Sequence, residues 1–150
     1  MRAAAEEGSS GVDDQRVAPD LEEMDEQEAC GFLEALMTDL GAESGYEFRH
    51  EDFVMEMPQS GERIRGRERM REFQAAFGEA APVMRLRRVM VRDRLWVAEV
   101  VSDYGGQTVH YVSIVELKDG KMWRDTRYYA EPFEAPEWRA RWVERMEDKR

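Results

Sequence analysis

Residues 95–130, LWVAEVVSDYGGQTVHYVSIVELKDGKMWRDTRYYA, contain the clearest structural signal in the chain. Two pairs of turn residues, Gly105-Gly106 and Asp119-Gly120, divide this stretch into three runs rich in β-branched and aromatic residues. Such pairs are favoured in two-residue hairpin turns, and β-branched and aromatic residues favour strands. The stretch therefore predicts three consecutive antiparallel strands, over 95–104, 107–117 and 121–130.

The sequence on either side of these strands predicts helices and shorter strands. Asp20 can cap a helix, with Glu23 completing a capping box and Gly41 ending it. The other predicted elements are strands over 53–57 and 62–65, a helix between Gly66 and Gly78, a strand over 84–92 and a helix from Ala135. This order predicts an α+β fold, in which helices cover one face of a single curved antiparallel sheet.

Length and composition predict one cytoplasmic domain. A chain of 150 residues can bury a core without disulfides or a structural metal, and one cysteine excludes an internal disulfide framework. No apolar run approaches the ~20 residues of a membrane-spanning helix, so we expect no membrane partner. The first residues also lack the apolar stretch of a signal peptide.

The net charge of −11 is concentrated near the N-terminus. Residues 1–30 hold ten acids and two bases, whereas residues 31–150 hold 23 acids and 20 bases. We expect residues 1–18 to form a disordered acidic tail and residues 19–150 to form the domain. An acidic chain makes nucleic-acid binding an unfavourable interpretation. The alternating arginines of residues 63–71 are interleaved with glutamates, which favours a solvated surface.

The two hairpin turns predict which residues share a face of the sheet. With two-residue turns, Glu99 lies opposite Val112, Val112 lies opposite Arg127, and His110 lies opposite Tyr129. One face then carries the polar residues Glu99, His110, Asp125, Arg127 and Tyr129 among the apolar residues Val97, Val101, Val112, Ile114 and Trp123. A single β-bulge would exchange the two faces beyond it.

The polar residues on this face allow two interpretations. Glu99 and Arg127 can form a buried structural pair beside a hydrogen-bonded His110. Alternatively, the face is the floor of a ligand pocket with groups for acid–base chemistry. A metal site at His50-Glu51-Asp52 is not expected, because the chain has only two histidines and no paired spacing of ligands supports a site.

The order of several short motifs resembles the nuclear transport factor 2-like superfamily and, within it, the SnoaL-like group. The resemblance covers roughly residues 20–145. Its carriers are Asp52-Phe53-Val54-Met55-Glu56-Met57-Pro58, Gly66 before the second helix, Glu116-Leu117-Lys118-Asp119-Gly120-Lys121 and Arg127-Tyr128-Tyr129. The resemblance implies a cone-shaped α+β barrel around a cavity, on the same sheet face that the hairpins predict, and often a homodimer. The other, outer face also carries many apolar residues, so we expect it to be covered by a homodimer partner or by the C-terminal helix with its tryptophans.

The resemblance also implies a function. Members include polyketide cyclases, ketosteroid isomerases, epoxide hydrolases and dehydratases, together with proteins that only bind or scaffold. We therefore expect a small hydrophobic or carbonyl-containing ligand and no cofactor. Either Glu99 or Asp125 would be the base, either His110 or Tyr129 would donate to an oxyanion, and Arg127 would orient the ligand. The expected apolar lining is Val97, Val101, Val112, Ile114, Trp123 and Met55. The alternative is a non-catalytic ligand-binding or dimerisation module.

Overall fold

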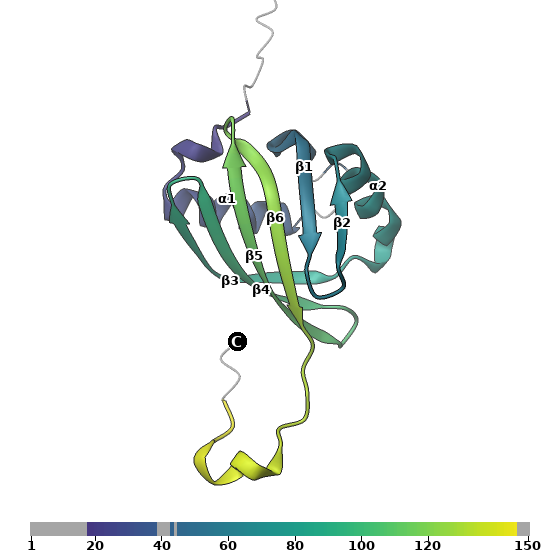
Figure 1. Cartoon of the computed structure of the whole chain (residues 1–150), viewed down its shortest axis with the longest axis vertical. Helices are drawn as coiled ribbons and strands as arrows, with labels where there is room; N and C mark the ends of the chain where they lie inside the picture. The colour runs from purple at the N-terminus through teal and green to yellow at the C-terminus, as the bar shows by residue number, and fades with distance from the viewer. Residues whose placement is uncertain (1–17, 39–42, 44, 147–150) are drawn as a thin grey trace, which may run out of the picture.

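The computed structural model describes residues 18–38, 43 and 45–146 of the chain. Figure 1 shows a curved sheet with α1 crossing one face and α2 flanking β1 and β2. The elements in chain order are η1 (Leu21–Glu23), α1 (Glu26–Thr38), η2 (Tyr46–Phe48), β1 (Arg49–Met57), β2 (Glu62–Arg65), α2 (Arg67–Phe77), η3 (Gly78–Ala80), β3 (Val83–Arg92), β4 (Leu95–Asp103), β5 (Thr108–Lys118), β6 (Lys121–Ala130) and η4 (Glu137–Trp142). The predicted α+β fold class is confirmed.

The six strands form one sheet in the order β2-β1-β6-β5-β4-β3. Strands β3 to β6 form the predicted antiparallel meander, and both predicted turns are present. Asp119 and Gly120 both have positive φ, as a two-residue turn of this hairpin class requires. The prediction of a wholly antiparallel sheet is wrong at one place, because β1 pairs with β6 in parallel. The sheet is therefore mixed.

The N-terminal helix begins later than predicted. Asp20 caps only the single turn η1, where its carboxylate accepts a hydrogen bond from the Glu22 amide at 2.9 Å. The capping box lies at α1 instead: the Asp25 carboxylate accepts from the Glu28 amide, and the Glu28 carboxylate accepts from the Asp25 amide. The predicted tail lies outside the described residues except for Ala18, and so does Gly41.

A β-bulge in β6 sets which of its residues face the core. Leu117 pairs with Met122 and Glu116 pairs with Arg124, so Trp123 is an extra residue on β6. Beyond it, Val115 pairs with Asp125.

The predicted register between β4 and β5 is confirmed, with Glu99 opposite Val112. The predicted register between β5 and β6 is wrong by one residue, because Tyr128, not Arg127, lies opposite Val112.

The inner face of the sheet, against which the helices pack, is the face opposite to the predicted one over β4 and β5. Trp96 and Val100 of β4 are fully buried, and Leu33 of α1 belongs to the same core cluster. The Phe32 ring of α1 meets the Trp96 ring edge-on at 6.0 Å between centroids. The bulge at Trp123 turns Asp125 toward this same inner face, where its side chain is buried.

The other face, here called the outer face, carries a band of half-buried and exposed apolar side chains. Met90, Val97 and Ile114 lie in one row across β3, β4 and β5. Val112 and Tyr128 lie side by side in the next row across β5 and β6. Among the described residues, the helices pack on the opposite side of the sheet, so this band has no helical cover.

The chain continues beyond β6 as a C-terminal arm, defined here as residues 131–146. The arm leaves the end of β6 and projects away from the sheet (Figure 1). Residues 131–136 form no helix or strand, and η4 follows directly after Pro136. The predicted helix from Ala135 is therefore a short 3₁₀ segment.

Candidate functional site

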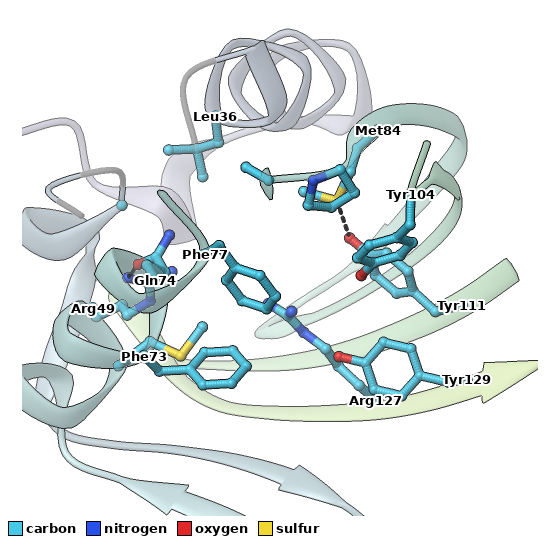
Figure 2. Close-up of a pocket in the computed structure, with 14 residues that line it drawn as sticks. Leu36, Arg49, Phe73, Gln74, Phe77, Met84, Tyr104, Tyr111, Arg127 and Tyr129 are labelled. Atoms are coloured by element: carbon cyan, nitrogen blue, oxygen red, sulfur yellow. Dashed lines mark hydrogen bonds between the residues drawn. The ribbon is translucent and has the colours of Figure 1, made fainter. Parts of the chain in front are cut away.

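A pocket opens between α2 and the inner face of the sheet. It encloses about 710 Å³ between protein atoms, part of which is open to solvent. Figure 2 shows Phe73 and Phe77 of α2 on one side and Tyr104, Tyr111 and Tyr129 on the other, with Arg127 between them. Leu36, Met70, Ala81, Pro82 and Met84 complete the apolar lining. The pocket thus has an apolar wall facing a wall of phenol and guanidinium groups.

Arg127 is held by an ion pair along its own strand. Asp125 and Arg127 are two residues apart on β6, so their side chains project from the same face. The Arg127 Nε and Nη2 atoms both lie 2.8 Å from the Asp125 Oδ2 atom. The Ser113 hydroxyl on β5 donates to the Asp125 Oδ1 atom at 2.5 Å. Both carboxylate oxygens therefore accept hydrogen bonds from the protein, which fixes the orientation of Arg127.

A second buried arginine reaches the same pocket from β1. Arg49 is 6% exposed, and its Nη1 atom donates to the Gln74 side chain of α2 at 2.8 Å. Burial, reinforced by repulsion from Arg127 and partly offset by attraction to Asp125, lowers the pKa of Arg49 to about 10. For Arg127, burial lowers the pKa, but the Asp125 charge outweighs it and holds the pKa above its usual range. Both side chains are cations at neutral pH.

The three tyrosines present hydroxyl groups to the pocket. The Tyr111 hydroxyl donates to the Met84 Sδ atom at 3.3 Å. Burial raises the pKa of Tyr111 to about 12, and burial also raises the pKa of Tyr104. Protonated phenols and guanidinium groups donate hydrogen bonds, so this wall of the pocket suits an oxygen that accepts them.

The Tyr111→Phe variant is expected to lose less stability at alkaline pH than the wild type. Since burial raises the pKa of Tyr111 from 10 to about 12 in the folded chain, its stabilising contribution is complete below pH 10 and is lost as the pH rises toward 12. At about 1.4 kcal/mol per pKa unit, the wild type should lose roughly 2–3 kcal/mol more than Tyr111→Phe across that interval. Urea unfolding of both proteins at several pH values measures this difference, and parallel stability curves would contradict it.

The structure separates the five predicted polar residues into two groups. Asp125, Arg127 and Tyr129 lie at the pocket or its inner end. Glu99 and His110 lie on the outer face, since each pairs within the β4–β5 ladder with an outer-face valine. Glu99 bonds to the Arg88 Nε atom at 2.6 Å and to the Arg87 Nη1 atom at 3.3 Å. The predicted Glu99–Arg127 pair is therefore absent among these described residues.

The predicted apolar lining also lies elsewhere. Four of its members occupy the outer face: Val97, Val101, Val112 and Ile114. Trp123 lies at the bulge, where the Lys118 and Arg124 cations approach its ring at 5.1 Å and 4.8 Å. Met55 is fully buried in the core beside Asp125 in the β1–β6 pairing.

Several pocket residues were not predicted as site residues. The hairpin register predicts that Tyr104 and Tyr111 lie on the sheet face opposite to Glu99. They do lie on that other face, which is the face that lines the pocket. Phe73 and Phe77 form one side of α2 and meet edge-on at 5.0 Å between ring centroids. Arg49 gave no local signal, because its pocket partners come from β6 and α2.

Comparison with known proteins identifies the family. A family model described as a SnoaL-like domain matches residues 32–125. The chain belongs to this SnoaL-like family. The match begins within α1 and ends at Asp125 in β6, and thus includes most of the strands that form the pocket. No curated protein sequence matches this SnoaL-like chain.

Solved structures share the fold of the SnoaL-like domain. An NTF-2 like protein of unknown function from Burkholderia xenovorans LB400 is 30% identical, with a TM-score of 0.67 over 78% of this chain and 94% of that one. A putative ketosteroid isomerase from Kribbella flavida DSM 17836 is 23% identical, with a TM-score of 0.71 over 83% and 94%. An LEH-like epoxide hydrolase of M. tuberculosis is 18% identical, with a TM-score of 0.54 over 70% and 84%.

Two further observations concern metals and membranes. Across the described ranges of this SnoaL-like domain, His, Cys, Asp and Glu side chains form no group of three or more placed to hold a metal ion. None of its described helices combines the length and the apolar character needed to cross a bilayer.

Proposed function

We propose that this SnoaL-like domain binds a small, largely apolar molecule through one acceptor oxygen, either a carbonyl or a carboxylate. The observation that carries the proposal is the placement of Arg127 between Tyr111 and Tyr129, facing the phenylalanines of α2. The Arg127 guanidinium lies 5.6 Å from the centre of the Tyr111 ring. A ligand seated between the two walls would meet donors on one side and apolar rings on the other.

The state of Asp125 favours binding over general-base catalysis. Its two oxygens already accept from Ser113 and Arg127, so the carboxylate positions the guanidinium. In this arrangement Arg127 supplies charge to the ligand oxygen, because its contacts with Asp125 are made through the Nε and Nη2 atoms and leave the Nη1 atom on the ligand side of the proposal. The phenols of Tyr104 and Tyr129 would add neutral donors to the same oxygen.

Catalysis by proton transfer is the second candidate function. Asp125 also borders a more enclosed cavity deeper in the cone, together with Trp96 and Ser113. A buried carboxylate beside phenol donors can remove a proton from the carbon next to a carbonyl and return it, while the phenols donate hydrogen bonds to the carbonyl oxygen. In that version the chain is a cofactor-free isomerase, cyclase or lyase with Asp125 as base and Tyr129 as donor.

A matched ligand series tests the proposed binding mode. Arylalkyl carboxylates are expected to bind about 10–100-fold more tightly than their primary amides, because a charged hydrogen bond contributes roughly 1.5–3 kcal/mol. The double variant Asp125→Leu/Arg127→Met should lose this preference and retain weak binding through the apolar wall. Titration calorimetry measures both affinities. Equal binding of acids and amides by the wild type would contradict the anionic form of the proposal.

The two candidate functions separate in a deuterium-exchange experiment. The methyl ketones that correspond to these acids are incubated with the protein in D₂O, and NMR detects exchange next to the carbonyl. A catalytic Asp125 predicts exchange that Asp125→Asn abolishes. Binding without exchange supports the binding function alone.

A further inference from the structure

A second cavity, here called the inner cavity, adjoins the pocket on the side of the core. It encloses about 600 Å³ between protein atoms, part of which is open to solvent. Leu36, Met84, Tyr111 and both buried arginines line the pocket and the inner cavity alike. The rest of its apolar wall consists of buried core residues: Leu33, Trp96, Ala98, Val100, Val115 and Met122. A ligand in the pocket can therefore extend past Arg127 toward the core.

Trp96 supplies an unpaired polar atom among the residues that line the inner cavity. Its side chain is fully buried, and within the described part of the chain its Nε1 atom has no hydrogen-bond partner. Buried N–H groups are nearly always hydrogen-bonded, because an unpaired one keeps its full desolvation cost. The two carboxylate oxygens in the same wall, both on Asp125, already accept from Ser113 and Arg127. The natural partner for the Trp96 N–H is therefore an acceptor that a ligand brings.

Small side chains lie on the sheet between Arg127 and Trp96. Ala98 pairs with Ser113, and Ser113 pairs with Arg127, so these three residues form one row across β4, β5 and β6. Trp96 is two residues from Ala98 along β4. With strands about 4.8 Å apart and a rise of about 3.4 Å per residue, roughly 12 Å separates the Arg127 and Trp96 Cα atoms. Ala98 and Ser113 fill little of the space above this stretch of sheet, whereas a leucine at position 98 would occupy it.

We propose that the inner cavity holds the far end of an elongated ligand, and that the Trp96 indole N–H donates a hydrogen bond to a second oxygen there. The inference rests on the proposed function, in which Arg127 holds the first oxygen. A second carboxylate would be buried beside Asp125, so the far oxygen is neutral: a ketone, an ether or a hydroxyl. The ligand class is thus an apolar chain or ring system with an oxygen at each end. Ala98 determines specificity, because its small side chain leaves room for the far end.

Matched pairs of ligands test the second oxygen. Straight-chain carboxylic acids of about five to ten carbons, a range that covers the distance between the two rows, are compared with the methyl-ketone acids of the same length. The ratio of keto-acid to plain-acid affinity is expected to peak at one length. Trp96→Phe keeps an aromatic ring but removes the N–H, and should lower that ratio about 10-fold, since the ketone is then buried without a donor. Titration calorimetry measures the affinities.

A second tryptophan provides the matched control. Trp123→Phe makes the same substitution at the bulge, at a residue that lines neither cavity, and should leave the ratio unchanged. Because both ligands of a pair meet the same cavity, the ratio is insensitive to the smaller ring of Trp96→Phe.

Ala98→Leu tests the specificity role. The larger side chain fills the inner cavity, so this variant should bind the longest acids at least 10-fold more weakly and the shortest acids within about 2-fold of the wild type. An equal effect at every length, or none, overturns the role of Ala98. Circular dichroism shows that each variant is folded.

NMR detects the proposed hydrogen bond in the wild-type chain. Its four tryptophans give four indole N–H signals, and Trp96→Phe identifies the one from Trp96. If that variant does not fold, the Phe variants of Trp123, Trp138 and Trp142 identify the signal by elimination. The Trp96 indole proton is expected to move downfield when the keto acid of the preferred length binds, and to move less with the plain acid.

The outcomes separate this inference from the proposed function. Acids that bind more tightly than their amides, with no ketone preference at any length and no shift of the Trp96 signal, overturn the second oxygen alone. Equal binding of acids and amides, with a ketone preference that Trp96→Phe removes, rejects the anionic form of the proposed function and supports the inner cavity. If neither acids nor amides bind, both proposals fail.

Discussion

Asp125→Ala is expected to lower the free energy of unfolding by about 3–5 kcal/mol. The variant leaves the Arg127 guanidinium in its largely buried position without the carboxylate that lies 2.8 Å from two of its nitrogens. Loss of one member of a buried ion pair costs this much, since the remaining charge keeps its desolvation penalty. The Ser113 hydroxyl also loses its acceptor. Urea unfolding followed by circular dichroism measures the change.

Two controls separate the ion pair from a general effect of losing an aspartate. Asp119→Asn removes the charge of an exposed carboxylate that lies 3.1 Å from the His50 Nε2 atom and keeps a residue type that tolerates the positive φ of the turn, so it should change stability by less than about 1 kcal/mol. The double variant Asp125→Leu/Arg127→Met removes both charges and should recover most of the lost stability. If Asp125→Ala falls within 1 kcal/mol of the wild type, the pair contributes little and the account of Arg127 is wrong.

Deletion of Trp123 is expected to remove the bulge and to leave the rest of β6 in register with β5. Trp123 is the extra residue of the β6 bulge, so without it Met122 still pairs with Leu117 and Arg124 still pairs with Glu116. Asp125 therefore stays opposite Val115 on the inner face, and Arg127 stays on the same side of β6. The deletion variant should show a cooperative transition in thermal unfolding by calorimetry.

The matched control keeps the bulge and removes only the side chain. Trp123→Ala loses the contacts of the ring with Lys118 and Arg124, which are worth about 0.5–1 kcal/mol each at exposed sites. It should therefore unfold cooperatively at a slightly lower temperature. A deletion variant without a cooperative transition would mean that the bulge itself is required for folding, and would contradict this account of β6.

Local sequence patterns were sufficient to predict most strands and both hairpin turns. The turns are determined by Gly105-Gly106 and Asp119-Gly120, whose positive φ angles few other residue pairs adopt. The bulge has no such local mark, because Trp123 is a normal strand residue and its extra position is set by pairing with β5. A one-residue shift exchanges the faces of a strand, so this single feature explains why Glu99 and His110 were grouped with Asp125, Arg127 and Tyr129.

The rest of the site depends on contacts that no local pattern contains. Arg49 belongs to the pocket because β1 pairs in parallel with β6 and because α2 brings Gln74 to it. Parallel pairing requires a long connection, and the turn signals in the chain describe only antiparallel neighbours. Even so, three of the five predicted polar residues lie together on the inner face, since their alternate spacing along β6 survives the shift.

The parallel contact between β1 and β6 also sets an order of assembly during synthesis. On the ribosome, β1 and β2 emerge well before β6, whereas β3 to β6 can pair as consecutive hairpins once made. The β1–β2 hairpin must therefore remain without its main partner until β6 is complete. Until then the Arg49 side of the pocket is separate from the Asp125–Arg127 side, so the binding site forms only in the last stage of folding.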